Sequence, residues 1–156
     1  ISQQISTAAA RTIRQRLEDR LSPKRVTAEA LLQLDVHSLR EAGLSRQKTS
    51  YVLDLAVKTQ QGVIRFDRHR KLSDQQIIDQ LTQVHGIGEW TAQMFLIFSL
   101  GRRDVLAGDD LGIRQAILKA YDLSELPGRK ECERMGEKWR PYASMACWYL
   151  WRSLDG

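Results

Sequence analysis

Two cysteines, Cys132 and Cys147, are all that the chain contains. Two thiolates cannot hold a four-cysteine iron–sulfur cluster, and no Cys-x-x-Cys motif is present, so we expect no such cluster. The three histidines are scattered without the spacing of metal ligands. No apolar run approaches the length that crosses a bilayer, so we expect no membrane partner. No segment shows the clear alternation of apolar and polar residues that is typical of a β-strand, which argues against a sheet.

The composition is that of an ordinary globular protein. Hydrophobic residues make up 42% of the chain and charged residues 28%, and 156 residues suffice for one domain with a sizeable core. We therefore predict a single domain over residues 1–156. The net charge of +5 mildly favours an anionic partner. The first residue, Ile1, already lies within a helical pattern, so we expect an N-terminal part of the domain to precede it.

Helical periodicity predicts an all-α fold. Apolar residues recur every four positions near the start of the chain, and later segments repeat this pattern between residues that cap helices and glycines that end them. The expected helices cover 1–21, Thr27 to Leu34, Val36 to Gly43, Ser45 to about Gly62, Ser73 to Val84, Glu89 to Leu100, Asp110 to Tyr121, 131–139 and Pro141 onward, with a basic link at 65–71 and a loop at 123–130.

The stretch from Leu81 to Asp110 organises the chain. Ser73 and Gln76 form a candidate capping box for the helix that precedes it. Two glycines, one at 86 and one at 88, then interrupt the periodicity and admit a tight turn. Free N–H groups at such a turn and at the following helix start suit a phosphate. The alternative is a plain connection between packed helices, because Gly-x-Gly alone is weak evidence.

Asp110 and the tryptophans are the candidates for chemistry. An aspartate before a helix is most often its N-cap, but beside a phosphate-binding turn it is also a candidate catalytic carboxylate, stabilised by the positive helix end. Trp90, Trp148 and Trp151 are either core residues or members of a stacking pocket for a flipped base. A cationic alkylated purine would gain about 1–2 kcal/mol from such rings.

In chain order, several segments resemble those of the 3-methyladenine DNA glycosylase II family of the helix–hairpin–helix DNA glycosylase superfamily. The resemblance spans nearly the whole chain and implies a compact multi-helix fold, here expected without its N-terminal helices. The matching segments are Ile1 to Ser6, Gly43 to Lys48, Val84 to Ala92, Gly101 to Val105, Asp110 to Arg114, and Trp139 to Trp151.

The resemblance implies roles for individual residues. Asp110 matches the family's catalytic aspartate, and Trp90 and Trp151 match aromatic positions of the base pocket. Relatives that also cut the strand carry a lysine where this chain has Trp90, so we expect no lyase activity. The residues that match the family's DNA-backbone contacts are Gly86, Ile87, Gly88 and Thr91. Gln4 matches the wedge that fills the gap left in the DNA by the flipped base. The main-chain oxygens of Thr82, Val84 and Ile87 match those that hold Na⁺ or K⁺.

The implied function is a monofunctional DNA glycosylase that hydrolyses the N-glycosidic bond of alkylated purines in duplex DNA, in base excision repair of alkylation damage. No cofactor beyond the alkali cation is expected. We expect a monomer whose partner is double-stranded DNA with damaged bases, in the nucleoid-associated cytoplasm of a bacterium or in a eukaryotic nucleus. The alternatives are a non-catalytic DNA-binding module, a glycosylase for other damaged or mismatched bases, and an all-α protein with an unrelated partner.

Overall fold

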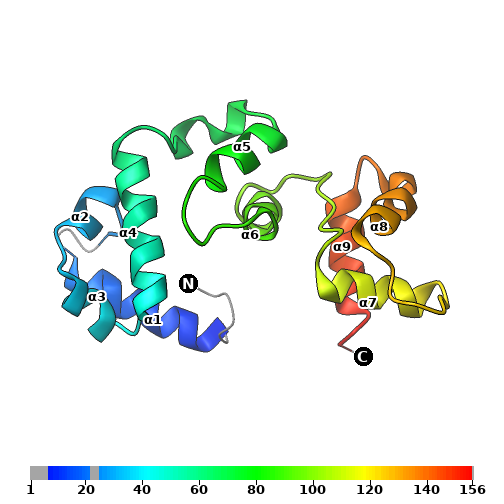
Figure 1. Ribbon diagram of the computed structural model, residues 1–156, viewed down its shortest axis with the longest axis horizontal. Helices are drawn as coiled ribbons and strands as arrows, with labels where there is room; N and C mark the ends of the chain where they lie inside the picture. Colours follow the sequence, from blue (N-terminus) through cyan, green and yellow to red (C-terminus); the bar gives the residue numbers. More distant parts are fainter. Residues whose placement is uncertain (1–6, 22–24, 156) are drawn as a thin grey trace. The chain divides into compact units, whose positions relative to one another are not determined.

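The computed structural model describes residues 7–21 and 25–155, and all regular structure in these ranges is helical (Figure 1). The all-α prediction is confirmed. No helix within these ranges is both long and apolar enough to span a bilayer. The helices are α1 (Thr7–Arg20), α2 (Ala28–Leu32), α3 (Val36–Glu41), α4 (Arg46–Gln60), α5 (Asp74–Leu81), α6 (Glu89–Met94), α7 (Leu111–Ala120), α8 (Arg129–Gly136) and α9 (Ala143–Arg152), with the short turns η1 (Phe66–Lys71), η2 (Phe95–Ser99) and η3 (Glu137–Trp139).

The chain forms two compact units, which we describe separately. The first consists of Ile1–Lys71 with Asp79–Ile87, and the second of Leu72–Ile78 with Gly88–Gly156. The division does not test the prediction of one domain over residues 1–156, which stays a prediction.

In the first unit, α2 and α3 pack against α4 (Figure 1). Side-chain caps start these helices: Thr27 accepts from the Ala30 N–H, and Ser45 accepts from the Lys48 N–H. Gly43 follows α3 with φ +107°, as its predicted stop. Between the helices lies a buried apolar core that consists of Leu17, Leu31, Leu39, Ala42, Leu44 and Ala56.

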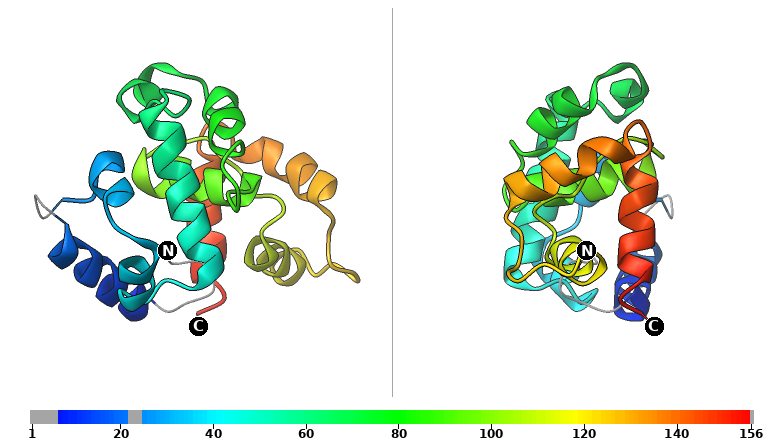
Figure 2. Two further views of the ribbon diagram at one scale, coloured as in Figure 1. Left: turned by 60° about the vertical axis from the view of Figure 1, so that its left-hand side comes forward. Right: turned by 90° about the vertical axis from the view of Figure 1, so that its right-hand side faces the viewer.

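In the second unit, α7 packs against α8 and α9 (Figure 2). Both cysteines are buried in its core, and burial raises the pKa of each thiol. They lie among apolar side chains rather than at the surface. The buried members of this core are Ala107, Ile113, Ile117, Cys132 and Cys147.

Ser144 joins α9 to the loop that leads to α7. Its hydroxyl donates to the Arg102 carbonyl at 2.7 Å and accepts from the Val105 N–H at 2.9 Å, and its own N–H donates to the Arg103 carbonyl at 3.0 Å. The neighbouring Asp104 accepts from the Ala143 N–H at 3.2 Å. These bonds fix the loop before α7 against the start of α9.

Some predicted helix boundaries were wrong. The helix predicted to reach Leu100 widens into the π-helical turn η2, in which the Leu100 N–H donates to the Phe95 carbonyl at 3.1 Å. The loop predicted at 123–130 ends earlier, because Arg129 begins α8 and pairs with Glu133 one turn on, at 2.8 Å. The last helix begins at Ala143 rather than at Pro141. The Asp104 side chain accepts the N–H of Ala143, the first residue of this helix.

The basic link predicted at 65–71 contains a short helix. The turn η1 is closed at its start by the Arg68 N–H, which donates to the Arg65 carbonyl at 2.9 Å. His69 is fully buried within it, while Arg68 and Arg70 are exposed. This basic segment therefore has a regular structure with the buried His69 ring inside it, which the pattern of charges in the sequence did not reveal.

Candidate active site

Asp110 is the N-cap of α7, as its position predicted. Its Oδ1 accepts the Ile113 N–H at 2.9 Å. The side chain therefore stands at the positive end of a ten-residue helix. Capping and chemistry are compatible here, because a carboxylate has two oxygens and the cap uses one of them.

Two tryptophans from other helices donate to the same carboxylate. Trp90, in the first turn of α6, places its indole Nε1 2.7 Å from Oδ2, and Trp151, near the end of α9, places its Nε1 2.8 Å from Oδ1. The three residues proposed from sequence are thus in direct contact within the second unit. Hydrogen bonds to an ionised acceptor are shorter and stronger than those between neutral groups, and both distances fall in that range.

An ion pair anchors the helix that carries Trp90. Glu89 receives two hydrogen bonds from the Arg129 guanidinium, at 2.6 and 2.8 Å, which join the start of α6 to the start of α8. Hydrogen bonding from Arg129 lowers the pKa of the Glu89 carboxyl. Arg129 also reaches Glu133 at 2.8 Å. The indole of Trp90 is therefore carried on a helix start that is fixed against a neighbouring helix.

Gly112 leaves room for the contact between Asp110 and Trp151. A Cβ at position 112 would lie 3.1 Å from Oδ1 of Asp110 and 3.2 Å from Cδ1 of Trp151. The Trp151 ring also lies 5.7 Å from the ring of Phe98, centroid to centroid. The indole therefore has a glycine backbone and an aromatic ring as neighbours, and both limit its orientation.

In the first unit, the segment before the predicted hairpin is held on α4. The His85 N–H donates to Oδ2 of Asp54 at 2.7 Å, and the His85 ring meets the Tyr51 ring edge-on at 4.8 Å. Gly86 has φ +80°, and a Cβ there would overlap the Tyr51 ring. Lys58 donates to Asp54 at 2.6 Å, and this hydrogen bond, followed by that from His85, lowers the pKa of the Asp54 carboxyl.

The other predicted DNA-backbone residues lie on either side of the division between units. Ile87 closes the turn in the first unit, with its N–H donating to the Val84 carbonyl at 3.0 Å. Gly88 is the N-cap of α6 in the second unit, and Thr91 is partly buried in the first turn of that helix. The predicted wedge residue Gln4 lies outside the described residues.

The predicted alkali-ion ligands come from the same turn of the first unit. Main-chain carbonyls are hard oxygen donors of the class that such cations take. The Val84 carbonyl already accepts the Ile87 N–H at 3.0 Å, and a carbonyl oxygen has a second lone pair to offer. The residues present thus fit the cation chemically.

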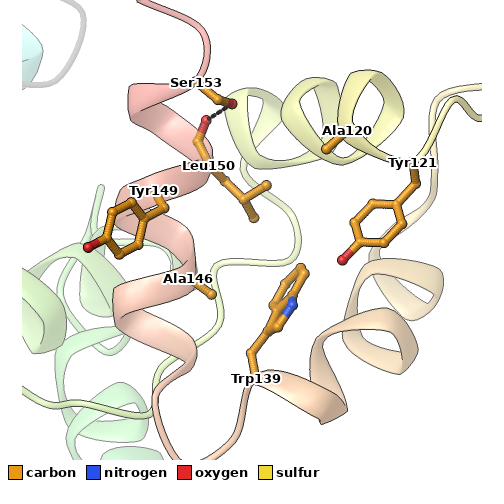
Figure 3. Close-up of a pocket in the computed structure, with 7 residues that line it drawn as sticks. All are labelled: Ala120, Tyr121, Trp139, Ala146, Tyr149, Leu150 and Ser153. Carbon is orange, nitrogen blue, oxygen red and sulfur yellow. Dashed lines mark hydrogen bonds between the residues drawn. The ribbon is translucent and has the colours of Figure 1, made fainter.

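A separate hollow of about 440 Å³ opens in the second unit among α7, α9 and η3 (Figure 3). Trp139 and Leu150 point toward each other in it, and the hydroxyl of Ser153 donates to the Leu150 carbonyl at 2.7 Å. Neither Asp110 nor its two indole donors line this hollow. It is lined by Ala120, Tyr121, Trp139, Ala146, Tyr149, Leu150 and Ser153.

Sequence reasoning missed the residues that support the turn in the first unit and those that support the carboxylate in the second. Asp54 and His85 are thirty-one positions apart, and Glu89 and Arg129 forty, so no local pattern joins them. Two of the supporting ion pairs are local, at i, i+4 spacing: Asp54 with Lys58, and Arg129 with Glu133.

Comparison with known proteins decides the family. The sequence profile of the HhH-GPD superfamily of base excision DNA repair proteins matches residues 1–141. The chain belongs to this superfamily. The HhH-GPD fold was also the fold predicted from the resemblance, and solved members superpose on the chain closely.

Two solved HhH-GPD structures are similar over nearly the whole chain. The Schizosaccharomyces pombe 3-methyladenine DNA glycosylase Mag1, in complex with abasic DNA, is 33% identical with a TM-score of 0.85, and the match covers 99% of this chain and 76% of that one. A DNA-3-methyladenine glycosidase from Bacillus halodurans is 35% identical with a TM-score of 0.86, over 97% of this chain and 70% of that one. The protein YfjP of Bacillus subtilis is 32% identical over 81% of this chain, which spans only 44% of YfjP.

Proposed function

We propose that this HhH-GPD protein is a monofunctional DNA glycosylase that removes alkylated purines of the 3-methyladenine type from duplex DNA and leaves an abasic site. The observation that carries the proposal is the Asp110 carboxylate, held at the start of α7 by two indole N–H groups at 2.7 and 2.8 Å. The names of the similar Schizosaccharomyces pombe and Bacillus halodurans proteins support the choice of base.

The reaction is hydrolysis of the bond between C1′ of the sugar and the base nitrogen. The bond breaks with its electron pair leaving on the base, and positive charge develops on the sugar. Because an alkylated purine is already cationic, it departs as a neutral base without needing a proton. Asp110 stabilises the developing sugar cation electrostatically. The oxygen of water then bonds to C1′, and the proton that water loses passes through the carboxylate to solvent.

The chain reaches a base by binding the duplex backbone and flipping the nucleotide out of the stack. In this proposal the turn of Gly86, Ile87 and Gly88, together with Thr91, binds phosphates without reading sequence. Gln4 fills the gap in the duplex, and one chain acts alone as a monomer. Main-chain oxygens of Thr82, Val84 and Ile87 hold a Na⁺ or K⁺, whose charge would favour a nearby phosphate.

We further propose that the enzyme does not cut the strand. A lyase forms a Schiff base between an amine and C1′, and the residue at the position of the lyase lysine is Trp90. An indole nitrogen carries no nucleophilic lone pair, so no covalent bond to the sugar forms there. The product is an intact strand with an abasic site.

The deciding experiment measures release of free base from methylated duplex DNA by the wild type, by Asp110→Asn and by Asp109→Asn. Asp109 is the exposed neighbouring carboxylate and serves as the matched control. We expect release by the wild type and by Asp109→Asn, and loss of release with retained DNA binding in Asp110→Asn. Binding without release by the wild type would favour a DNA-binding module, whereas release of only oxidised or mismatched bases would reassign the substrate.

A further inference from the structure

The hydrogen bonds to Asp110 differ between its two carboxylate oxygens. A carboxylate offers about four acceptor positions, two on each oxygen. Oδ1 accepts the Ile113 N–H at 2.9 Å and the Trp151 indole at 2.8 Å, which uses both of its positions. Among the described contacts, Oδ2 accepts only the Trp90 indole, at 2.7 Å. One acceptor position therefore remains, and it is on Oδ2.

We infer that Oδ2 is the oxygen that acts on the sugar and the water, and that Trp90 and Trp151 are positioning residues that aim it through their N–H groups. This assignment rests on the proposed glycosylase function and adds to it. It gives the two tryptophans a role beyond that of aromatic surfaces for the flipped base. Oδ1 becomes the anchored oxygen, shared between the α7 cap and α9.

The chemistry of the donors favours this role. The three groups that donate to the carboxylate, two indoles and one backbone amide, are electrically neutral. An arginine or lysine would hold the carboxylate as firmly but would neutralise much of its field. Neutral donors fix its direction and leave its negative charge available for a cationic sugar. Such fixed groups do not have to reorganise during the reaction.

Stacking and donation use different parts of an indole. The Nε1–H lies on one edge of the ring, while a base would stack on a face. Trp90 is 41% exposed although its Nε1–H is bonded to Asp110, so the ring keeps surface for a base. Replacement by phenylalanine keeps an aromatic face and removes the donor. This substitution separates the two roles.

The kinetic test compares Trp90→Phe and Trp151→Phe with Tyr149→Phe, a control at an exposed residue of α9 that likewise loses a donor and keeps its ring. If the N–H groups position Oδ2, each of the first two variants should slow base release at saturating DNA by about tenfold or more, with KM for DNA changed less than about twofold. Tyr149→Phe should match the wild type. Rates within twofold of wild type for both site variants, or a change confined to KM, would overturn the assignment.

A second test needs no turnover. The indole N–H signals of the folded protein are recorded by ¹⁵N NMR, and the Phe variants identify those of Trp90 and Trp151. Asp110→Asn replaces one acceptor oxygen by an NH₂ group, so at least one of these two signals should move upfield, whereas those of Trp139 and Trp148 should stay and report an intact fold. Asp109→Asn should move neither. Unmoved signals in Asp110→Asn would overturn the assignment, while an inactive wild type would instead overturn the proposed function.

Discussion

Gly112 lies so close to Cδ1 and Nε1 of the Trp151 indole that a single added methyl group would stand 3.2 Å from Cδ1 of that ring and 3.1 Å from Oδ1 of Asp110. Such distances are tighter than ordinary van der Waals contacts, so either the ring or the carboxylate must shift. The absence of a side chain at position 112 is thus part of how the carboxylate and its donor meet.

Gly112→Ala should therefore slow base release by about ten- to a hundredfold, because sub-ångström displacement of a catalytic group is costly. The folded state should persist, since alanine in a helix is favoured over glycine by about 0.5–1 kcal/mol. Single-turnover base release and thermal unfolding would be measured together. Gly128→Ala, at a position with open space and φ −76°, is the control and should release base normally. Full activity in Gly112→Ala would contradict the tight fit.

Gly86→Ala should destabilise the first unit by about 1–3 kcal/mol, because residue 86 has φ +80° and its Cβ would overlap the Tyr51 ring. Urea unfolding measures the change. In a Tyr51→Ala background the same substitution should cost less, since the overlap is gone and only the backbone strain remains. Equal costs in the two backgrounds would mean that Tyr51 does not restrict this position.

Asp54→Ala should weaken binding to undamaged duplex DNA by about three- to tenfold at fixed salt, because the His85 N–H loses its acceptor at 2.7 Å and the turn that follows is less well fixed. The rate at saturating DNA should be unchanged. The control is Asp67→Ala, which removes a carboxylate of the same unit that pairs with Arg65 at 3.1 Å. Equal loss of affinity in both variants would exclude a specific role for Asp54.

The bond between Glu89 and Arg129 should make stability depend on pH in the acid range. Hydrogen bonding from Arg129 lowers the pKa of Glu89 below its ordinary value of 4.5. A lowered pKa means that the stabilisation is fully present above about pH 4.5 and is lost as pH falls through the lower, folded-state value. The side chains are partly exposed, so the contribution should stay below about 1 kcal/mol.

The corresponding measurement is the thermal midpoint between about pH 3 and 6. In Glu89→Gln the thermal midpoint should fall less than in the wild type as the pH is lowered, whereas Glu125→Gln, at an exposed residue between α7 and α8, should follow the wild-type curve. A wild-type curve reproduced by Glu89→Gln would contradict a stabilising ion pair at this position.

Local signals in the sequence predicted most helix starts. Thr27 and Ser45 each accept the N–H three residues on, and Ser73 and Gln76 exchange the two bonds of a capping box, at 3.2 and 2.9 Å. Such signals act within one turn, so they can be read without knowledge of the tertiary structure. The π-helical turn after α6 has no comparable signature and was not predicted.

The sequence brought Asp110, Trp90 and Trp151 together only through the resemblance to a family. Their contact spans twenty and forty-one positions, and no spacing rule specifies that both indoles turn their N–H edges toward one carboxylate. That orientation depends on how α6, α7 and α9 pack. The prediction of stacking surfaces concerned the faces of the rings and not their edges, and it stays a prediction.

The hydrogen bonds of Ser144, on α9, to the loop at 102–105 restrict how this part of the protein can change in evolution. Its hydrogen bonds, at 2.7, 2.9 and 3.0 Å, all end on main-chain atoms of the loop. A side chain in that loop can therefore be exchanged by mutation without removing these bonds. The side chains of this loop are free to diverge between descendants, while its attachment to α9 is inherited through the backbone.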